Sequence, residues 1–214
     1  MKTTNSNITD LTEALRKHFD ETPEEKLKQD WSDVEKSTEG VDSPPIDEFI
    51  DFHKNIHEER KNMKKVYKAP EIWPNIYDKT LIFLAGAIDM GKARDWQKEV
   101  TEKILEGGHN DVIILNPRRD DWDSSWEQTM ENKQFREQVE WELKGLDDAD
   151  LVILVLTKDS KAPISLLELG LEAKNKKVVV VCEDGFYRKG NVEIVCNKYD
   201  IPLHNTLEEL YKKL

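Results

Sequence analysis

Short apolar runs alternate with longer helical patterns from residue 80 to residue 213, and this alternation restricts the chain to few folds. The apolar runs have the length of strands and lie at 81–85, 112–115, 151–156, 178–182 and 201–203. Helical patterns follow them at 93–106, at 131–148, from residue 163, at 192–199 and at 207–213. Strands separated by helices form a parallel sheet that carries helices on both faces. The sequence therefore predicts an α/β fold, a flavodoxin-like five-stranded parallel sheet.

Residues 1–70 have a different pattern, which predicts an acidic, α-helical N-terminal appendage with a linker. The sequence Thr22-Pro23-Glu24-Glu25 is typical of a helix start, and Leu27 and Trp31 follow at helical spacing. Pro70 and Pro74 interrupt any regular element before the first apolar run. We therefore divide the chain into an appendage, residues 1–70, and an α/β domain, residues 71–214.

Composition excludes several classes of function. A net charge of −12 argues against binding a nucleic-acid polymer, because that requires a basic surface. The chain has two cysteines, no signal-peptide pattern and no apolar run that would span a membrane, so we expect a cytoplasmic protein without a disulfide framework. His53 and His57 lack the glutamate of a zinc-protease helix, and no metal or other cofactor is expected.

In open parallel sheets, ligands bind beyond the carboxyl ends of the strands, so the segments that follow the strands are candidate binding residues. The first segment, with Gly86, Ala87, Ile88 and Asp89, opens a helix, and its backbone N–H groups can hold an anion or a sugar hydroxyl. The spacing differs from the dinucleotide fingerprint, and the signal alone is weak, because any strand-to-helix turn can carry glycines.

The segment after the second apolar run carries Asn116, Arg118, Arg119 and Trp122. The two arginines can bind a phosphate or carboxylate of a ligand, or neutralise a buried acid of the protein itself. Trp122 can stack on a nucleobase, or fold its loop back on the sheet.

Two acidic residues lie on the apolar stripes of successive helices. Glu168 lies among Ile164, Leu167 and Leu171 in a helix that has no obvious polar side, and an unpaired buried carboxylate is costly. Glu142 lies at the buried edge of an apolar stripe in the preceding helix, which is formed by Phe135, Val139, Leu143 and Leu146. Paired carboxylates carry out glycosyl-transfer chemistry, whereas the alternative for either residue is a cap or an ion pair.

Four motifs together resemble the nucleoside 2-deoxyribosyltransferase superfamily over residues 80–182. They are Leu84-Ala85-Gly86-Ala87-Ile88, Asn116-Pro117-Arg118-Arg119, Trp141-Glu142-Leu143 with Ala149-Asp150, and Ser165-Leu166-Leu167-Glu168-Leu169-Gly170. The resemblance implies a flavodoxin-like fold, Glu168 as the nucleophile, Glu142 as the assisting helix acid and sites completed in a homo-oligomer. The family aspartate six residues before the nucleophile is replaced by Ala162, for which Ser165 or Asp159 can substitute.

The activity implied is cleavage of the N-glycosidic bond of a deoxynucleoside and transfer of the deoxyribosyl group to another base through a glycosyl-Glu168 intermediate. Two alternatives stay open. One is hydrolysis of a nucleoside 5′-monophosphate or another N-glycoside, with Arg118 or Arg119 holding the phosphate. The other is a non-catalytic nucleotide-binding or interaction module. In each case the partner is a small nucleoside or nucleotide.

Overall fold

The computed structural model describes residues 18, 21–37, 51, 64–74, 79–88, 94–108, 111–175 and 177–213. The chain divides into two compact units, Met1–Met63 and Lys64–Leu214. In the first unit, helix α2 (Glu24–Ser37) begins directly after Pro23, and Leu27 on its inner face is buried. The other helices expected in residues 1–63, with His53 and His57, lie outside the described residues.

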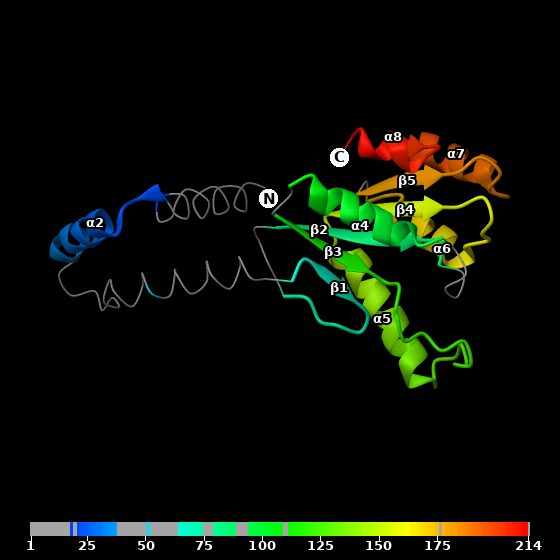
Figure 1. The fold of residues 1–214 in the computed structure, drawn as a ribbon, viewed down its shortest axis with the longest axis horizontal. Coiled ribbons are helices and arrows are strands. Elements are labelled where there is room, and N and C mark those ends of the chain that lie inside the picture. The colour runs from blue at the N-terminus through cyan, green and yellow to red at the C-terminus, as the bar shows by residue number, and fades with distance from the viewer. Residues whose placement is uncertain are drawn as a thin grey trace. The chain divides into compact units, whose positions relative to one another are not determined.

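The second unit contains a parallel sheet of six strands in the order β1-β3-β2-β4-β5-β6 (Figure 1). The strands are β1 (Val66–Lys68), β2 (Thr80–Gly86), β3 (Val112–Asn116), β4 (Leu151–Leu156), β5 (Val178–Cys182) and β6 (Leu203–His204). The five strands from β2 onward have the flavodoxin-like order that the sequence predicts.

The predicted number of strands was wrong, because β1 adds a sixth. Val66–Lys68 pairs with β3, Val66 facing Ile114, so the sheet begins before the predicted boundary at residue 70. Three residues are too few to show an alternating pattern, and this strand lies within a basic run. Its central residue, Tyr67, is buried, which explains why the edge strand is held in place.

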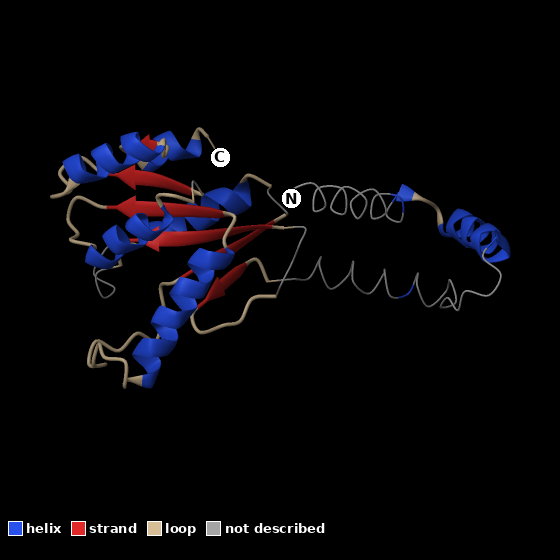
Figure 2. Ribbon diagram, turned by 180° about the vertical axis from the view of Figure 1, so that it is seen from behind, coloured by secondary structure: helices blue, strands red, loops and turns tan. Residues whose placement is uncertain are grey.

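Helices cover both faces of the sheet. Helices α4 (Trp96–Glu106) and α8 (Leu207–Tyr211) pack on one face, where Ile82, Leu84 and Ile114 form a core with Trp96 and Leu207. Helix α5 (Lys133–Asp148) packs on the opposite face, where Gly145 allows close approach to Phe83 and Leu115. Right-handed crossovers place α6 (Pro163–Glu172) and α7 (Lys189–Tyr199) on the α5 face as well. Figures 1 and 2 show the two faces from opposite sides.

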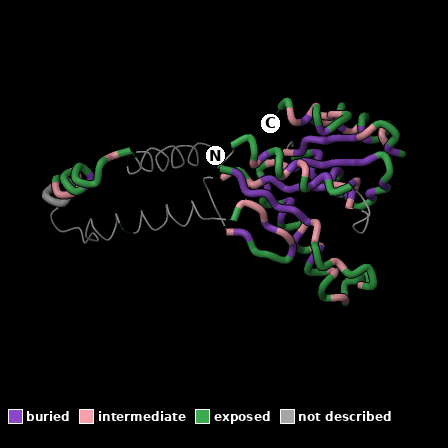
Figure 3. Tube along the Cα trace, viewed as in Figure 1, coloured by how far each residue is buried: buried purple, intermediate pink, exposed green. Residues whose placement is uncertain are grey.

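The strands β2 to β5 are buried on both faces over most of their length, and every residue of β3 and β5 is buried (Figure 3). Such strands are apolar at every position, which is why the sequence reveals them. The direction of the crossovers reverses between β2 and β4, since the crossover from β2 leads to β3 on one side and the crossover from β4 leads to β5 on the other. Ligands of this fold class bind at that point, beyond the carboxyl ends of the two strands. In the described part of the chain no helix is long and apolar enough to cross a membrane.

Candidate active site

A cavity of about 490 Å³ lies at the carboxyl ends of β2, β3 and β4, between the loops that follow them and helices α5 and α6. Its lining includes eight of the residues singled out from the sequence: Gly86, Ile88, Arg118, Arg119, Trp122, Glu142, Ser165 and Glu168. The two acidic residues therefore border one cavity, although they come from different helices.

Helix α6 turns a polar face toward the protein. Its buried residues are Ser165, Glu168, Leu169 and Glu172, whereas Ile164, Leu167 and Leu171 are 60%, 60% and 51% exposed. The prediction that Glu168 lies within a buried apolar stripe was therefore wrong: the stripe faces outward along the rim of the cavity. Glu172 forms an ion pair with Lys177 and accepts a hydrogen bond from Asn175, so its role is structural.

The residues at the start of α6 determine the position of Glu168 in the helix. Ala162 precedes the helix in a left-handed conformation, with φ of 40°, and Pro163 occupies the first turn. Ala162 lines the cavity, so no carboxylate lies at the position where the family resemblance expects aspartate. Of the two proposed substitutes, Ser165 lines this cavity, and Asp159 borders a different depression.

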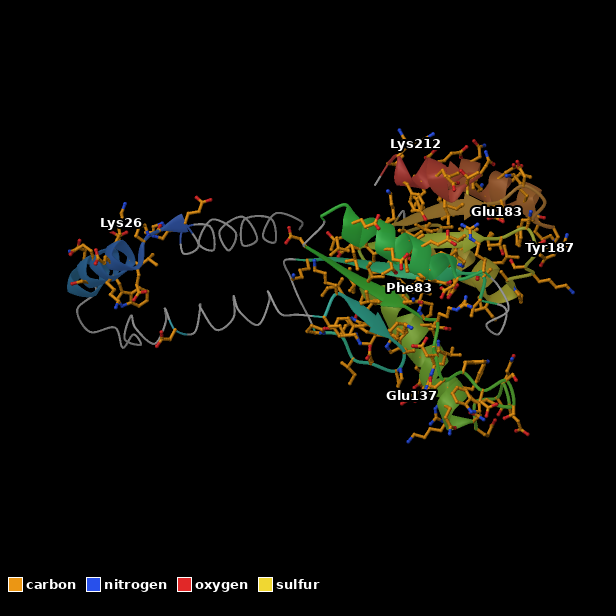
Figure 4. The ribbon with its side chains drawn as sticks, viewed as in Figure 1. Lys26, Phe83, Glu137, Glu183, Tyr187 and Lys212 are labelled. Carbon is orange, nitrogen blue, oxygen red and sulfur yellow. The ribbon has the colours of Figure 1, made fainter. Side chains whose placement is uncertain are left out.

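Helix α5 presents Glu142 to the same cavity. The buried residues of α5 are Gln138, Trp141, Gly145 and Leu146, so the predicted stripe was correct only at Leu146. Phe135, Val139 and Leu143 line the cavity instead. Glu142 also lines the cavity, and its exposure is intermediate. Glu137 of the same helix is exposed and lies on its outer side (Figure 4).

The surroundings of Glu142 and Glu168 favour the neutral form of both carboxyl groups. Burial raises the pKa of Glu142 to about 7, and a hydrogen bond from Gln138 partly offsets that rise. Burial, and then the charge of Glu142, raise the pKa of Glu168 to about 8. Burial and a neighbouring like charge are the conditions under which carboxyl groups act as acids near neutral pH.

Gln138 is a site residue that the sequence analysis missed. Its Nε2 donates to the backbone oxygen of Pro117 at 2.9 Å and to Oε1 of Glu142 at 2.7 Å. The side chain thereby ties the acid to the loop that follows β3. The spacing of four residues to Glu142 places both on one helix face, which was the available signal.

The loop after β3 brings Arg119 and Trp122 to the cavity. Arg119 donates from Nε and Nη2 to both carboxylate oxygens of Asp121, at 2.8 and 2.9 Å, and its guanidinium lies 5.1 Å from the ring centre of Trp126. Trp122 and Trp126 pack edge to face. The carboxylate partner of Arg119 is therefore Asp121, whereas Arg118 lies 3.9 Å from Asp95 at the start of α4.

The turn after β2 is shaped by Gly86, whose φ is 144° and whose absent Cβ would lie 2.3 Å from the backbone oxygen of Val155. Ala87 does not line the cavity, because its N–H donates to Val155 and its oxygen accepts from Trp96. Asn116 is likewise outside the lining, and its side chain accepts from the N–H of Arg118. Asp89 lies outside the described residues.

A second depression, of about 680 Å³, lies beyond β4, β5 and β6. Three of its charged lining residues take part in ion pairs: Arg94 pairs with Glu183 and with Glu99, and Asp184 pairs with Lys189. Figure 4 marks Glu183 at the end of β5. Within the described residues, no group of three or more His, Cys, Asp and Glu side chains is arranged to hold a metal ion.

A flavodoxin-like sheet, with two carboxyl groups of raised pKa at the point where the crossovers change direction, has the layout of an α/β domain that binds a small ligand at the carboxyl ends of its strands. Residues 79–186 match the family described as nucleoside 2-deoxyribosyltransferase like. The match covers half of the chain, and the protein belongs to this family. Comparison with curated proteins gives no match.

Proposed function

We propose that the protein cleaves the N-glycosidic bond of a deoxynucleoside and transfers the deoxyribosyl group to a second base. The observation that carries this proposal is the pair Glu142 and Glu168, which border one cavity from two helices and have raised pKa values. Paired carboxyl groups supply the nucleophile and the acid that glycosyl transfer requires. Family membership supports the same substrate class.

In the proposed reaction, the Glu168 carboxylate attacks C1′ as the bond between C1′ and the base nitrogen breaks. The electron pair of that bond leaves with the base, and a proton from Glu142 neutralises it. The result is a glycosyl ester on Glu168. A second base then attacks C1′, the ester bond breaks, and the proton of the incoming base returns to Glu142.

Between pH 7 and 8, Glu142 and Glu168 together hold the one proton that this scheme requires. In that range the pair holds one proton, because Glu142 ionises with a pKa of about 7 and Glu168 with a pKa of about 8. Of the two groups, Glu168 holds the proton, since Gln138 donates to Glu142 and so favours its charged form. Attack requires the proton to be on Glu142. We therefore propose that the bound base, which accepts a proton from Glu142, draws the shared proton to that side.

Hydrolysis of a nucleoside 5′-monophosphate is a second candidate, favoured by the presence of Arg118 and Arg119 in the lining. If the substrate carries a phosphate, Arg118→Gln should raise KM for the nucleotide and leave the KM for the nucleoside unchanged. Equal losses on both substrates would mean that Arg118 positions the loop.

Incubation of the full chain with each deoxynucleoside, with and without a second free base, tests the proposal. Formation of a new nucleoside only when the second base is present supports transfer. Release of free sugar without added base supports hydrolysis. Ligand binding without turnover, over a panel of nucleosides and nucleotides, would favour the non-catalytic alternative.

A further inference from the structure

The amide group of Gln138 joins two parts of the site. Its Nε2 donates to the backbone oxygen of Pro117 at 2.9 Å and to Oε1 of Glu142 at 2.7 Å. Gln138 is 4% exposed, so water does not compete for either hydrogen bond. Pro117 and Glu142 both line the cavity, one from the loop after β3 and the other from α5. Gln138 therefore connects the loop and the helix at the cavity.

The two partners determine the orientation of this amide. A backbone oxygen can only accept, so the atom that faces Pro117 is the amide nitrogen. The second hydrogen of that nitrogen goes to Glu142. A flipped amide would place two oxygens against each other at Pro117. Both hydrogens of Gln138 are thus used, and its orientation is fixed.

The contact with Gln138 makes the two oxygens of Glu142 different. A protonated carboxyl group has one carbonyl oxygen, which accepts, and one hydroxyl oxygen, which donates. Oε1 accepts from Gln138, so it takes the part of the carbonyl oxygen and the proton is carried on Oε2. Within the part of the chain that the structure describes, Gln138 is the only hydrogen-bond partner of the Glu142 carboxyl group. Oε2 is then the oxygen left to give a proton to a ligand.

Glu168 is held differently. Its carboxyl group has no hydrogen bond and no ion pair with any described residue, and the charge that acts on it is that of Glu142. The other charged residues of the cavity lining are Arg118 and Arg119. Of the two acidic residues, only Glu142 is therefore fixed by a donor. This difference suits an acid that delivers its proton from one place and a nucleophile that turns toward C1′.

We propose that Gln138 is a positioning residue: it keeps the proton of Glu142 on Oε2 and stabilises the carboxylate that remains when this proton passes to the leaving base. The inference rests on the proposed function, because it takes Glu142 as the acid. Gln138 touches no reacting atom and acts through Glu142. As the bond between C1′ and the base nitrogen breaks, the electron pair of that bond leaves with the base and takes up the proton of Oε2.

The charge that then develops on Glu142 strengthens the hydrogen bond from Gln138 to Oε1, because bonds to an ionised acceptor are the stronger ones. An interaction that is stronger in the transition state than in the ground state raises kcat and has little effect on KM. The bond to Pro117 does not change in this way, and it holds the amide in place. Gln138 should therefore act on the chemical step.

A double-mutant cycle on the full chain tests the inference. Gln138→Met should lower kcat about tenfold to hundredfold, as loss of a hydrogen bond to a charged group implies, and leave KM within about twofold. In the Glu142→Gln background the same change should cost less than about twofold, because the group through which Gln138 acts is gone. Equal losses in both backgrounds would overturn the inference. Gln134→Met is the control, since Gln134 is exposed on the same helix and should change neither quantity.

The pKa of Glu142, measured by ¹³C NMR of the labelled carboxyl groups, gives a readout that needs no turnover. Gln138→Met should raise this pKa by about one pH unit, because the hydrogen bond that favours the charged form is lost. If Gln138→Met does not fold, Gln138→Glu keeps the shape of the side chain and should raise the pKa as well, since an added carboxylate cannot donate and repels the charge of Glu142. An unchanged pKa in a folded variant would overturn the inference. If the unmodified chain converts no nucleoside, the proposed function fails, and the pKa of Glu142 alone decides whether Gln138 holds this carboxyl group.

Discussion

Glu142 and Glu168 are carboxyl groups whose charge the folded chain opposes, so each links stability to pH. Their folded pKa values of about 7 and about 8 lie above the ordinary value of 4.5. The native state therefore holds protons that the unfolded chain releases. Stability is fully present below pH 4.5 on this account and is lost as the pH rises through 7 and 8.

The first prediction is that the free energy of unfolding of the ligand-free chain falls between pH 5 and pH 9. Each proton retained only by the native state costs about 1.4 kcal/mol per pH unit. Glu168→Gln should flatten the fall and make the variant more stable than the parent at pH 9, because the amide has no charge to bury. Urea titrations at pH 5, 7 and 9 measure this. The control is Glu137→Gln on the exposed side of α5, which should keep the slope. If the free energy of unfolding falls with pH equally in the parent, Glu168→Gln and Glu137→Gln, the raised pKa of Glu168 is not the cause of the fall.

The second prediction concerns activity. The scheme requires one proton on the pair, so kcat/KM should be bell-shaped, with limbs near pH 7 and pH 8. Below the range Glu168 is neutral and cannot attack; above it no acid is available. Glu142→Gln should lose roughly 10²–10⁴ in rate. In this variant the pKa of Glu168 should fall, because the like charge of Glu142 is gone. Glu168→Gln should abolish turnover. If the pH dependence of kcat/KM in Glu142→Gln keeps the bell shape of the parent, Glu142 takes no part in the chemistry.

At the scale of the elements, burial decided what the sequence could reveal. Strands β2 to β5 are enclosed on both faces, so each is a continuous apolar run and was predicted within a residue or two. Strand β6 begins at Leu203, two residues later than predicted, and Pro202 before it lacks an N–H for strand pairing. Strand β1 gave no signal because three residues, of which the central one is buried, are too few to carry a pattern.

The helices of the site were harder to orient than to locate. The periodicity of α6 is correct, but its apolar face is the exposed one, because the buried face holds Ser165, Glu168 and Glu172. A rule that places apolar residues inside fails when a site occupies the inside. Glu168 therefore lines the cavity, but the argument that placed it on a buried apolar stripe was wrong. Gln138 was missed because an uncharged polar residue on a helix gives no signal until its partners are seen.

The third prediction tests how α5 is held on the sheet. A Cβ at Gly145 would lie 2.7 Å from the ring of Phe83, which is fully buried and cannot move aside. Gly145→Ala should lower the free energy of unfolding by about 1–3 kcal/mol and slow turnover, because Glu142 lies one helical turn away. Gly170→Ala is the control: its added Cβ meets nothing within 4 Å, so helix propensity should raise stability by up to about 1 kcal/mol. Denaturant titration and kcat measure both. Equal effects would mean that α5 has room to shift.

At the scale of the whole molecule, we propose that the chain forms a homo-oligomer through the rim of the cavity. Leu143, Ile164, Leu167 and Leu171 are large apolar side chains, each about half exposed or more, and all four border the cavity. Contiguous exposed apolar groups mark interaction surfaces. Leu167→Glu should therefore reduce the oligomer to monomers, measured by light scattering, and should lower activity if the neighbouring copy completes the site. Ile194→Glu, at a 69% exposed residue of α7 outside the cavity lining, is the control and should change neither.

The last prediction concerns residues 1–63, which we propose contribute no catalytic residue. Each side chain of the proposed mechanism belongs to the unit Lys64–Leu214. A chain that begins at Lys64 should therefore keep its sheet, by circular dichroism, and its kcat. The start must precede β1, because the backbone of Lys65 accepts from Ile114 and Val66–Lys68 covers the edge of β3. A chain that begins at Glu71 exposes that edge and should aggregate. If the chain from Lys64 folds, keeps its oligomeric state and yet loses all activity, residues 1–63 belong to the site, and the division into appendage and catalytic domain is wrong.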